Sequence, residues 1–194
     1  MTVGGSSTLT GAACTPNLVH WTYDNWNLAH STTTALVKTG GNAWYFVAPD
    51  YAYGKAVVAD ATKFVLQAGG RVTGASFFPF PDTTDFSAYA VRAQSSGANV
   101  VAFAAGGTDL VNFVKQCHEF GVAETARIAA MTGFVTDVLG VGVPIAQGMM
   151  ITENFTGTSM TAAAPGLPGC GRICRLRWFR IRWMQATMPA RCTT

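Results

Sequence analysis

The stretch Ala43-Trp-Tyr-Phe-Val-Ala-Pro-Asp-Tyr-Ala-Tyr-Gly54 decides the fold, because it joins a short apolar run directly to an amphipathic segment. The apolar run over 43–48 lies between paired glycines and a Pro-Asp pair, a pattern typical of a strand buried on both faces. From residue 54 to 68 apolar side chains recur at helical spacing, and Gly69-Gly70 ends the pattern. The stretch therefore predicts a strand followed by a helix.

The same alternation of strand and helix continues to residue 152. Further strands are predicted over 71–78, 99–104, 127–131 and 148–152, and further helices over 24–38, 85–95 and 107–120. Because the strands are apolar throughout instead of at every second residue, they indicate a parallel sheet with both faces covered. The predicted fold class is α/β, an open and mostly parallel sheet with helices on both faces.

Composition excludes several classes of protein. Hydrophobic residues make up 49% of the 194 residues and charged residues 12%, roughly half the average charged content of about 25%, so the chain is not a disordered one. No run of apolar residues is long and uninterrupted enough for a transmembrane helix. Residues 1–7 have neither a basic start nor an apolar core, so we do not expect them to be a signal peptide.

The loops that follow the strands are the places to look for a ligand, because open parallel sheets bind ligands at the carboxyl ends of their strands. The loop after the first strand carries Tyr51 and Tyr53, whose rings could present a flat apolar face to a small solute. The loop after the third strand carries Gly106 and Gly107 before a helix, where backbone N–H groups suit a carboxylate. For both loops the alternative is a structural role, as packed aromatic rings and as a tight turn.

Residues for catalysis or metal binding do not form a recognisable set. Gly-x-Ser-x-Gly and phosphate-loop patterns are absent, and Cys117 and His118, adjacent on a predicted helix, point about 100° apart. Cys170 and Cys174 have a spacing that zinc tolerates, but the three histidines lie far upstream. We expect no catalytic residue, no metal and no cofactor, and hence no enzyme.

Several ordered motifs together resemble a known family. They are Cys14-Thr-Pro-Asn-Leu-Val-His-Trp-Thr-Tyr-Asp24, Trp44-Tyr-Phe46, Asp50-Tyr-Ala-Tyr-Gly54, Thr84-Asp-Phe-Ser87, Gly106-Gly-Thr-Asp109, Lys115-Gln116 and Glu119-Phe-Gly121. Over residues 3–155 the chain resembles the periplasmic substrate-binding proteins of branched-chain amino acid type ABC transporters. The resemblance implies the type I periplasmic binding protein fold, in which two Rossmann-like α/β lobes close on a solute.

The resemblance also implies how the chain is divided. Residues 1–22 would be a remnant of the first lobe and hinge, residues 23–152 the second α/β lobe, and residues 153–155 a return crossing. A full member is about twice as long, so the chain resembles a fragment with an incomplete fold. A periplasmic location is implied as well, although this chain shows no export signal.

Four binding positions carry over from the family, three near the N-terminus and one in the loop after the first strand. Ser6, Ser7 and Thr8 lie where members use small hydroxyl residues and backbone groups to hold the carboxylate of the ligand. Tyr53 matches the tyrosine of the first second-lobe loop, which stacks on the solute or bonds to it.

The remaining binding positions bear on the class of ligand. Gly106, next to Gly107, lies where amino acid binders often place a second aromatic residue. Gly133 or Phe134 lies where they keep an acid for the ammonium group, and the nearest acid here is Asp137. Because a buried ammonium without a counter-charge costs several kcal/mol, we expect a neutral amide or an aromatic or aliphatic carboxylate instead of an ordinary α-amino acid.

The expected function is that of the solute-binding component of an ABC importer. Its partners would be the small-molecule solute and the permease and ATPase subunits, with the membrane reached only through the permease and no nucleic acid bound. The alternatives are a ligand-sensing regulatory or receptor domain of the same fold and an α/β enzyme.

A basic tail follows the resembling part. Residues 1–155 hold seven basic and ten acidic residues, whereas residues 156–194 hold six arginines and no acid. Codons TAC TGG GAC ATC GAT GAC for the family's Tyr-Trp-Asp continuation, read one base later, give Thr-Gly-Thr-Ser-Met-Thr, which is residues 156–161. The tail is therefore interpreted as out-of-frame or disordered, and the alternative is an arm with interleaved tryptophans that binds nucleic acid or a membrane.

Overall fold

The computed structural model describes residues 2, 4–20 and 22–152 of the chain. The return crossing expected at 153–155 and the basic tail expected at 156–194 lie outside these residues. Within the described part, no helix is both long enough and apolar enough to cross a lipid bilayer.

Five parallel strands form one sheet in the order β2-β1-β3-β4-β5, as the apolar strands predicted. The strands are β1 (Ala43–Pro49), β2 (Arg71–Phe78), β3 (Val100–Phe103), β4 (Arg127–Ala130) and β5 (Met150–Ile151). The open parallel α/β fold is thereby confirmed.

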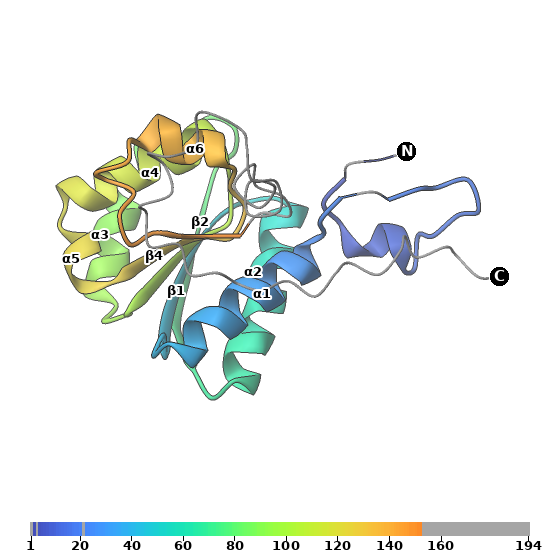
Figure 1. Ribbon diagram of the computed structural model, residues 1–194, viewed down its shortest axis with the longest axis horizontal. Helices are drawn as coiled ribbons and strands as arrows, with labels where there is room; N and C mark the ends of the chain where they lie inside the picture. Colours follow the sequence, from blue (N-terminus) through green and yellow to red (C-terminus); the bar gives the residue numbers. More distant parts are fainter. Residues whose placement is uncertain (1, 3, 21, 153–194) are drawn as a thin grey trace, which may run out of the picture.

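Helices cover both faces of the sheet, with α1 and α2 on one face and the later helices on the other (Figure 1). They are α1 (Asn25–Lys38), α2 (Ala52–Gln67), α3 (Ser87–Ser95), α4 (Thr108–Glu119), α5 (Val122–Thr125) and α6 (Val135–Val141), with a short 3₁₀ helix η1 (Ser7–Thr10) before them. The segment that carries η1 extends to one side of the α/β body (Figure 1).

Strand β1 is the centre of the core, because all seven of its residues are buried. Trp44 and Phe46 point toward α1 and α2, while Tyr45 and Val47 point toward the opposite layer. The polar atoms that this burial removes from water are bonded: Trp44 Nε1 donates to the carbonyl of Gly41 at 2.7 Å, and the Tyr45 hydroxyl lies 2.6 Å from Ser76 Oγ. The two-sided burial explains why the run is apolar at every position.

The ends of the helices depart from the prediction by one or two residues. Asp24 is the N-cap of α1, and its carboxylate accepts the N–H of Asn27 at 2.8 Å. Asp85 accepts the N–H of Ser87 at 2.9 Å, so α3 begins two residues after its predicted start. The short helices α5 and α6 were not predicted, because four and seven residues carry too little periodicity.

Strand order determines where loops diverge at the carboxyl edge. From β1 the chain moves outward to β2 and then returns past β1 to β3, so the connections after β1 and β3 go to opposite sides. A parallel sheet binds ligands at such a switch point, because the diverging loops leave room between them. The two connections in question are residues 50–51, which lead into the first turn of α2, and residues 104–107.

Shortening a side chain of the central strand should destabilise the fold strongly. Phe46 has no exposed surface, so Phe46→Ala should lower the free energy of unfolding in urea by about 3–5 kcal/mol. Leu66 on α2 is 57% exposed, and Leu66→Ala should change it by no more than about 0.5 kcal/mol. Equal losses in the two variants would contradict the assignment of the core.

Candidate functional site

Tyr53 connects two of the loops at the carboxyl edge of the sheet. It lies in the first turn of α2, directly after β1, and its hydroxyl is 2.7 Å from Oγ1 of Thr132 in the loop after β4. Burial raises the pKa of Tyr53 to about 12. The ring therefore spans the end of β3, the strand that separates β1 from β4 in the sheet.

The N-terminal segment lies directly on this ring. A Cβ atom added at Gly5 would be 3.0 Å from Cε2 of Tyr53 and 3.7 Å from Cε2 of Tyr23. Real Cβ atoms are seldom found so close to a ring carbon, so glycine is what allows the backbone to approach. Residues far apart in the chain thus meet at Tyr53.

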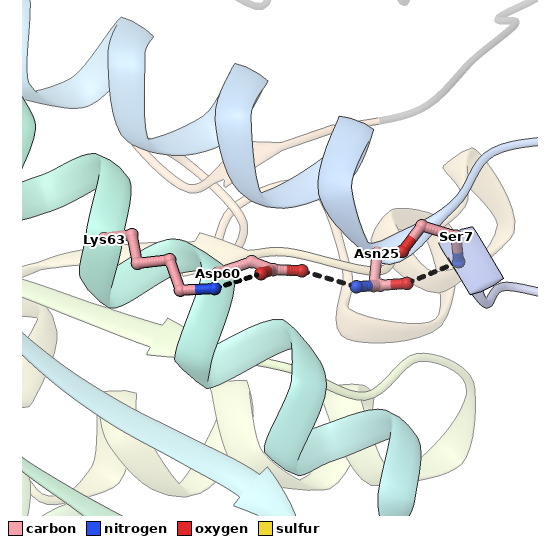
Figure 2. A network of polar contacts seen from close by, with 4 residues as sticks. All are labelled: Ser7, Asn25, Asp60 and Lys63. Atoms are coloured by element: carbon pink, nitrogen blue, oxygen red, sulfur yellow. Dashed lines mark hydrogen bonds and ion pairs between the residues drawn. The ribbon is translucent and has the colours of Figure 1, made fainter. Parts of the chain in front are cut away.

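Ser6, Ser7 and Thr8 follow Gly5 and begin η1. The hydroxyls of Ser6 and Thr8 bond to each other at 2.7 Å, and Ser6 also accepts the N–H of Thr8. The N–H of Ser7 is donated to Oδ1 of Asn25 at 2.8 Å (Figure 2). The three residues follow directly on Gly5, the residue that approaches the Tyr53 ring, and the Ser7 N–H already has an acceptor.

Gly106 and Gly107 form a turn that only glycine fits well. Gly107 has a φ of 68° and begins α4, and a Cβ at Gly106 would lie 3.2 Å from the carbonyl oxygen of Thr132. Oδ2 of Asp137 accepts the N–H of Gly107 at 3.2 Å and the N–H of Phe134 at 2.9 Å. Asp137, only 7% exposed, therefore joins the loop after β3 to the loop after β4.

Phe134 stands at the N-cap of α6 and is 38% exposed. Its ring centroid is 6.2 Å from that of Tyr23. Beyond Tyr53, the ring of Tyr51 lies 6.1 Å away and continues to Phe80 at 5.3 Å. Aromatic rings therefore line this edge from the loop after β2 to the loop after β4.

Two further tyrosine hydroxyls at this edge have pKa values above the ordinary one. Burial raises the pKa of Tyr23. Burial raises the pKa of Tyr51 as well, helped by the charge of Asp109. Both groups are therefore neutral hydrogen-bonding hydroxyls at physiological pH.

Through Thr132 and Asp137 the structure connects the predicted residues Tyr53, Gly106, Gly107 and Phe134. Ser6, Ser7 and Thr8 follow Gly5, which approaches the Tyr53 ring. Sequence reasoning did not assign the roles of Thr132 and Asn25, and it considered Asp137 only as a distant substitute for an ammonium partner. Each of these three acts by binding a residue at least 18 positions away or on another loop, and no local pattern signals such a contact.

Metal ligands do not gather in the described residues: no three of the His, Cys, Asp and Glu side chains there come together. Cys117 is fully buried in α4, and burial raises the pKa of its thiol to about 12. A thiol with so high a pKa is a poor nucleophile, and Cys117 acts as a small core residue.

A sequence profile named for the periplasmic binding proteins matches residues 1–166. The chain belongs to the periplasmic binding protein family. The resemblance seen in the sequence motifs is thereby confirmed. Among curated protein sequences no significant match was found.

Solved structures of the family share the fold. A periplasmic binding protein from Burkholderia mallei is 40% identical, with a TM-score of 0.71 over 76% of this chain and 39% of that chain. A branched-chain amino acid ABC transporter ligand-binding protein from Burkholderia xenovorans is 26% identical, with a TM-score of 0.70 over 86% of this chain and 48% of that one. A solute-binding protein from R. palustris in complex with 4-hydroxybenzoate is 23% identical, with a TM-score of 0.61 over 70% and 35%. The chain thus spans less than half the length of these relatives.

Removing the Asp137 carboxylate should loosen both loops that it joins. Asp137→Ala leaves two amide donors without their acceptor and should lower the free energy of unfolding by about 2–4 kcal/mol. Hydrogen exchange at Gly107 and Phe134 should accelerate. Asp137→Asn retains an accepting oxygen, so both the loss of unfolding free energy and the acceleration of exchange should be smaller. Unchanged exchange at these two amides in Asp137→Ala would contradict this role.

The titration of Tyr53 should make stability depend on pH in alkaline solution. The pKa is about 12 in the folded chain and 10.0 for an ordinary tyrosine, so between these values the unfolded chain releases a proton that the folded chain keeps. Stability is therefore full below pH 10 and falls as the pH rises, by roughly 2–3 kcal/mol for this group. Urea unfolding at pH 9 and 11 should show a steeper fall for the wild type than for Tyr53→Phe, and parallel curves would refute it.

Proposed function

We propose that this chain supplies one wall of the solute site of an ABC importer. The observation that carries the proposal is the meeting of Tyr53 with Gly5 and Thr132, which gathers three separate segments at the switch point of the sheet. In the family, such a site is closed by a second lobe, and closure holds the ligand by contacts alone. Permease and ATPase subunits would be the partners, and the periplasm the location.

The ligand class follows from the rings and the charges at this edge. Exposed faces of Phe134 and Tyr51 offer apolar contact for a flat or branched group. The Asp137 carboxylate, the acid nearest to Phe134 in sequence, already accepts two backbone N–H groups. Asp24 caps α1 through Asn27. Asp109, in the first turn of α4, carries a charge that acts on Tyr51. An ammonium group beside Phe134 itself would find Asp137 already engaged, which disfavours an ordinary α-amino acid in that position.

A small amide or an aromatic or aliphatic carboxylate fits these surroundings. Its carboxylate or carbonyl would lie near the hydroxyls of Ser6 and Thr8 and not at the Gly107 N–H, because the Asp137 carboxylate already occupies that donor. The structural neighbour solved with 4-hydroxybenzoate indicates that this fold accommodates an aromatic carboxylate.

Ligand-observed NMR on the chain tests the proposal. Saturation transfer should be seen for benzoate, benzamide and 4-methylpentanoate, with dissociation constants of about 1 mM or weaker because one wall alone leaves much of the ligand in water. Leucine should give no signal. Leucine binding equal to that of benzoate would contradict the ligand class, and the absence of any signal from all three probes would contradict the site.

A pair of matched aromatic variants locates the binding. Phe134 and Phe120 are 38% and 42% exposed, but Phe120 follows α4 at the other end of that helix from Gly107. Phe134→Ala should weaken the benzoate signal severalfold, in line with the loss of one ring contact, while Phe120→Ala leaves it unchanged. Equal effects would show that benzoate binds exposed rings without a site.

A further inference from the structure

The buried side chain of Asn25 and its backbone N–H form their hydrogen bonds with residues outside α1. It is the first residue of α1 and only 4% exposed. Its Oδ1 accepts the N–H of Ser7 at 2.8 Å, its Nδ2 donates to Oδ2 of Asp60 at 2.6 Å, and its backbone N–H donates to the carbonyl of Gly5 at 2.8 Å. Asp24 already caps this helix, so Asn25 is not needed as a cap.

These bonds tether the N-terminal segment to the α/β body. Among the described residues, the hydrogen bonds between residues 4–11 and residues 22–152 are the two that Asn25 makes, to Gly5 and to Ser7. The other bonds of residues 4–11 stay within the N-terminal segment. No residue of η1 is buried, so the two bonds to Asn25 and the contact of Gly5 with Tyr53 are what hold this segment against the body.

The orientation of the amide is set from the other side by α2. Asp60 accepts from Nδ2 and thereby leaves Oδ1 facing Ser7, and Lys63 lies 3.3 Å from the second carboxylate oxygen of Asp60 (Figure 2). The side chain of Asp60 is 20% exposed and that of Lys63 68% exposed. Figure 2 shows the four residues in one line from α2 to η1.

We propose that Asn25 is a positioning residue of the solute site: it holds Gly5 against Tyr53 and thereby fixes Ser6 and Thr8 relative to the aromatic wall. This inference rests on the proposed function for its effect on binding. Solute affinity then depends on Asn25, although its buried side chain has both polar atoms engaged and touches no solute.

Exchanging the two side chains gives a matched rescue. Asn25→Ala removes the bonds of Oδ1 and Nδ2. The backbone N–H of residue 25 can still bond to Gly5, but the anchor at Ser7 that keeps Gly5 in place is lost. Asn25→Asp sets two carboxylates against each other, and their repulsion should displace the new side chain from the Ser7 N–H. Combining Asn25→Asp with Asp60→Asn restores one carboxylate and one amide at the same distance, with the charge now at the favourable N-terminus of α1. Lys63→Ala is the control, because its exposed ion pair contributes little.

Two ligand-free measurements by NMR on the chain decide the positioning. In the wild type, the Ser7 amide should be protected from hydrogen exchange, and Gly5 should show a nuclear Overhauser effect to the Tyr53 ring. Asn25→Ala and Asn25→Asp should accelerate Ser7 exchange by about tenfold or more, as expected for losing such a bond, and weaken the Gly5–Tyr53 effect. The exchanged pair and Lys63→Ala should resemble the wild type.

Benzoate affinity then separates positioning from a purely structural role. The two single variants should bind benzoate about fivefold or more weakly, and the exchanged pair should recover wild-type affinity, whereas a structural role would shift only the urea midpoint. Retained Ser7 protection in Asn25→Ala, or unchanged benzoate affinity once the Gly5–Tyr53 contact is lost, would overturn the inference. Absence of benzoate binding in the wild type would instead refute the proposed function, and the ligand-free measurements would still decide the positioning.

Discussion

Burial of β1 on both faces is the constraint on which the rest of the structure depends. A strand with no exposed residue needs helices on two sides, so the chain must cross the sheet in both directions. Those crossings place α1 and α2 on one face and α3 to α6 on the other. The strand order 2-1-3-4-5 meets this requirement, and it brings the diverging loops after β1 and β3 with it. The location of the candidate site is therefore a consequence of how the core is packed.

Polar contacts made at these loop ends give the edge its shape. Tyr53 bonds to Thr132, and Asp137 bonds to Gly107 and Phe134, so loops after three different strands are joined pairwise. Hydrogen bonds to a buried carboxylate are strong, because water does not compete with them and the acceptor carries charge. A loop held in this way loses less conformational entropy on binding a ligand than a free loop would.

Local patterns in the sequence were enough for the fold and for part of the candidate site. Each of the five strands overlaps a predicted strand, and Arg71–Phe78 agrees at both ends, because apolar runs and glycine stops are local signals. Tyr53 and the Gly106-Gly107 turn could be named because strand-end loops of parallel sheets follow a general rule. The tethering role of Asn25 could not be read, because Ser7 is 18 residues away and Asp60 is 35 residues away. An asparagine at the start of a helix is ordinarily explained as a helix cap. Only the folded chain shows that Asp24 already has this role.

The distribution of these contacts bears on how closure of a two-lobed site would work. A segment that is bonded to α1 and lies on Tyr53 follows the motion of this sheet, even though the resemblance assigns residues 1–22 to the first lobe and hinge. On the proposed function, the hydroxyls of Ser6 and Thr8 and the rings of Tyr53 and Phe134 then form one preorganised wall. The ligand's contacts with this wall exist before closure, so they favour neither the open nor the closed state. The free energy of closure must therefore come from new contacts between the ligand and the opposite lobe. A ligand that reaches across to the opposite lobe drives closure, and one that contacts only this wall does not.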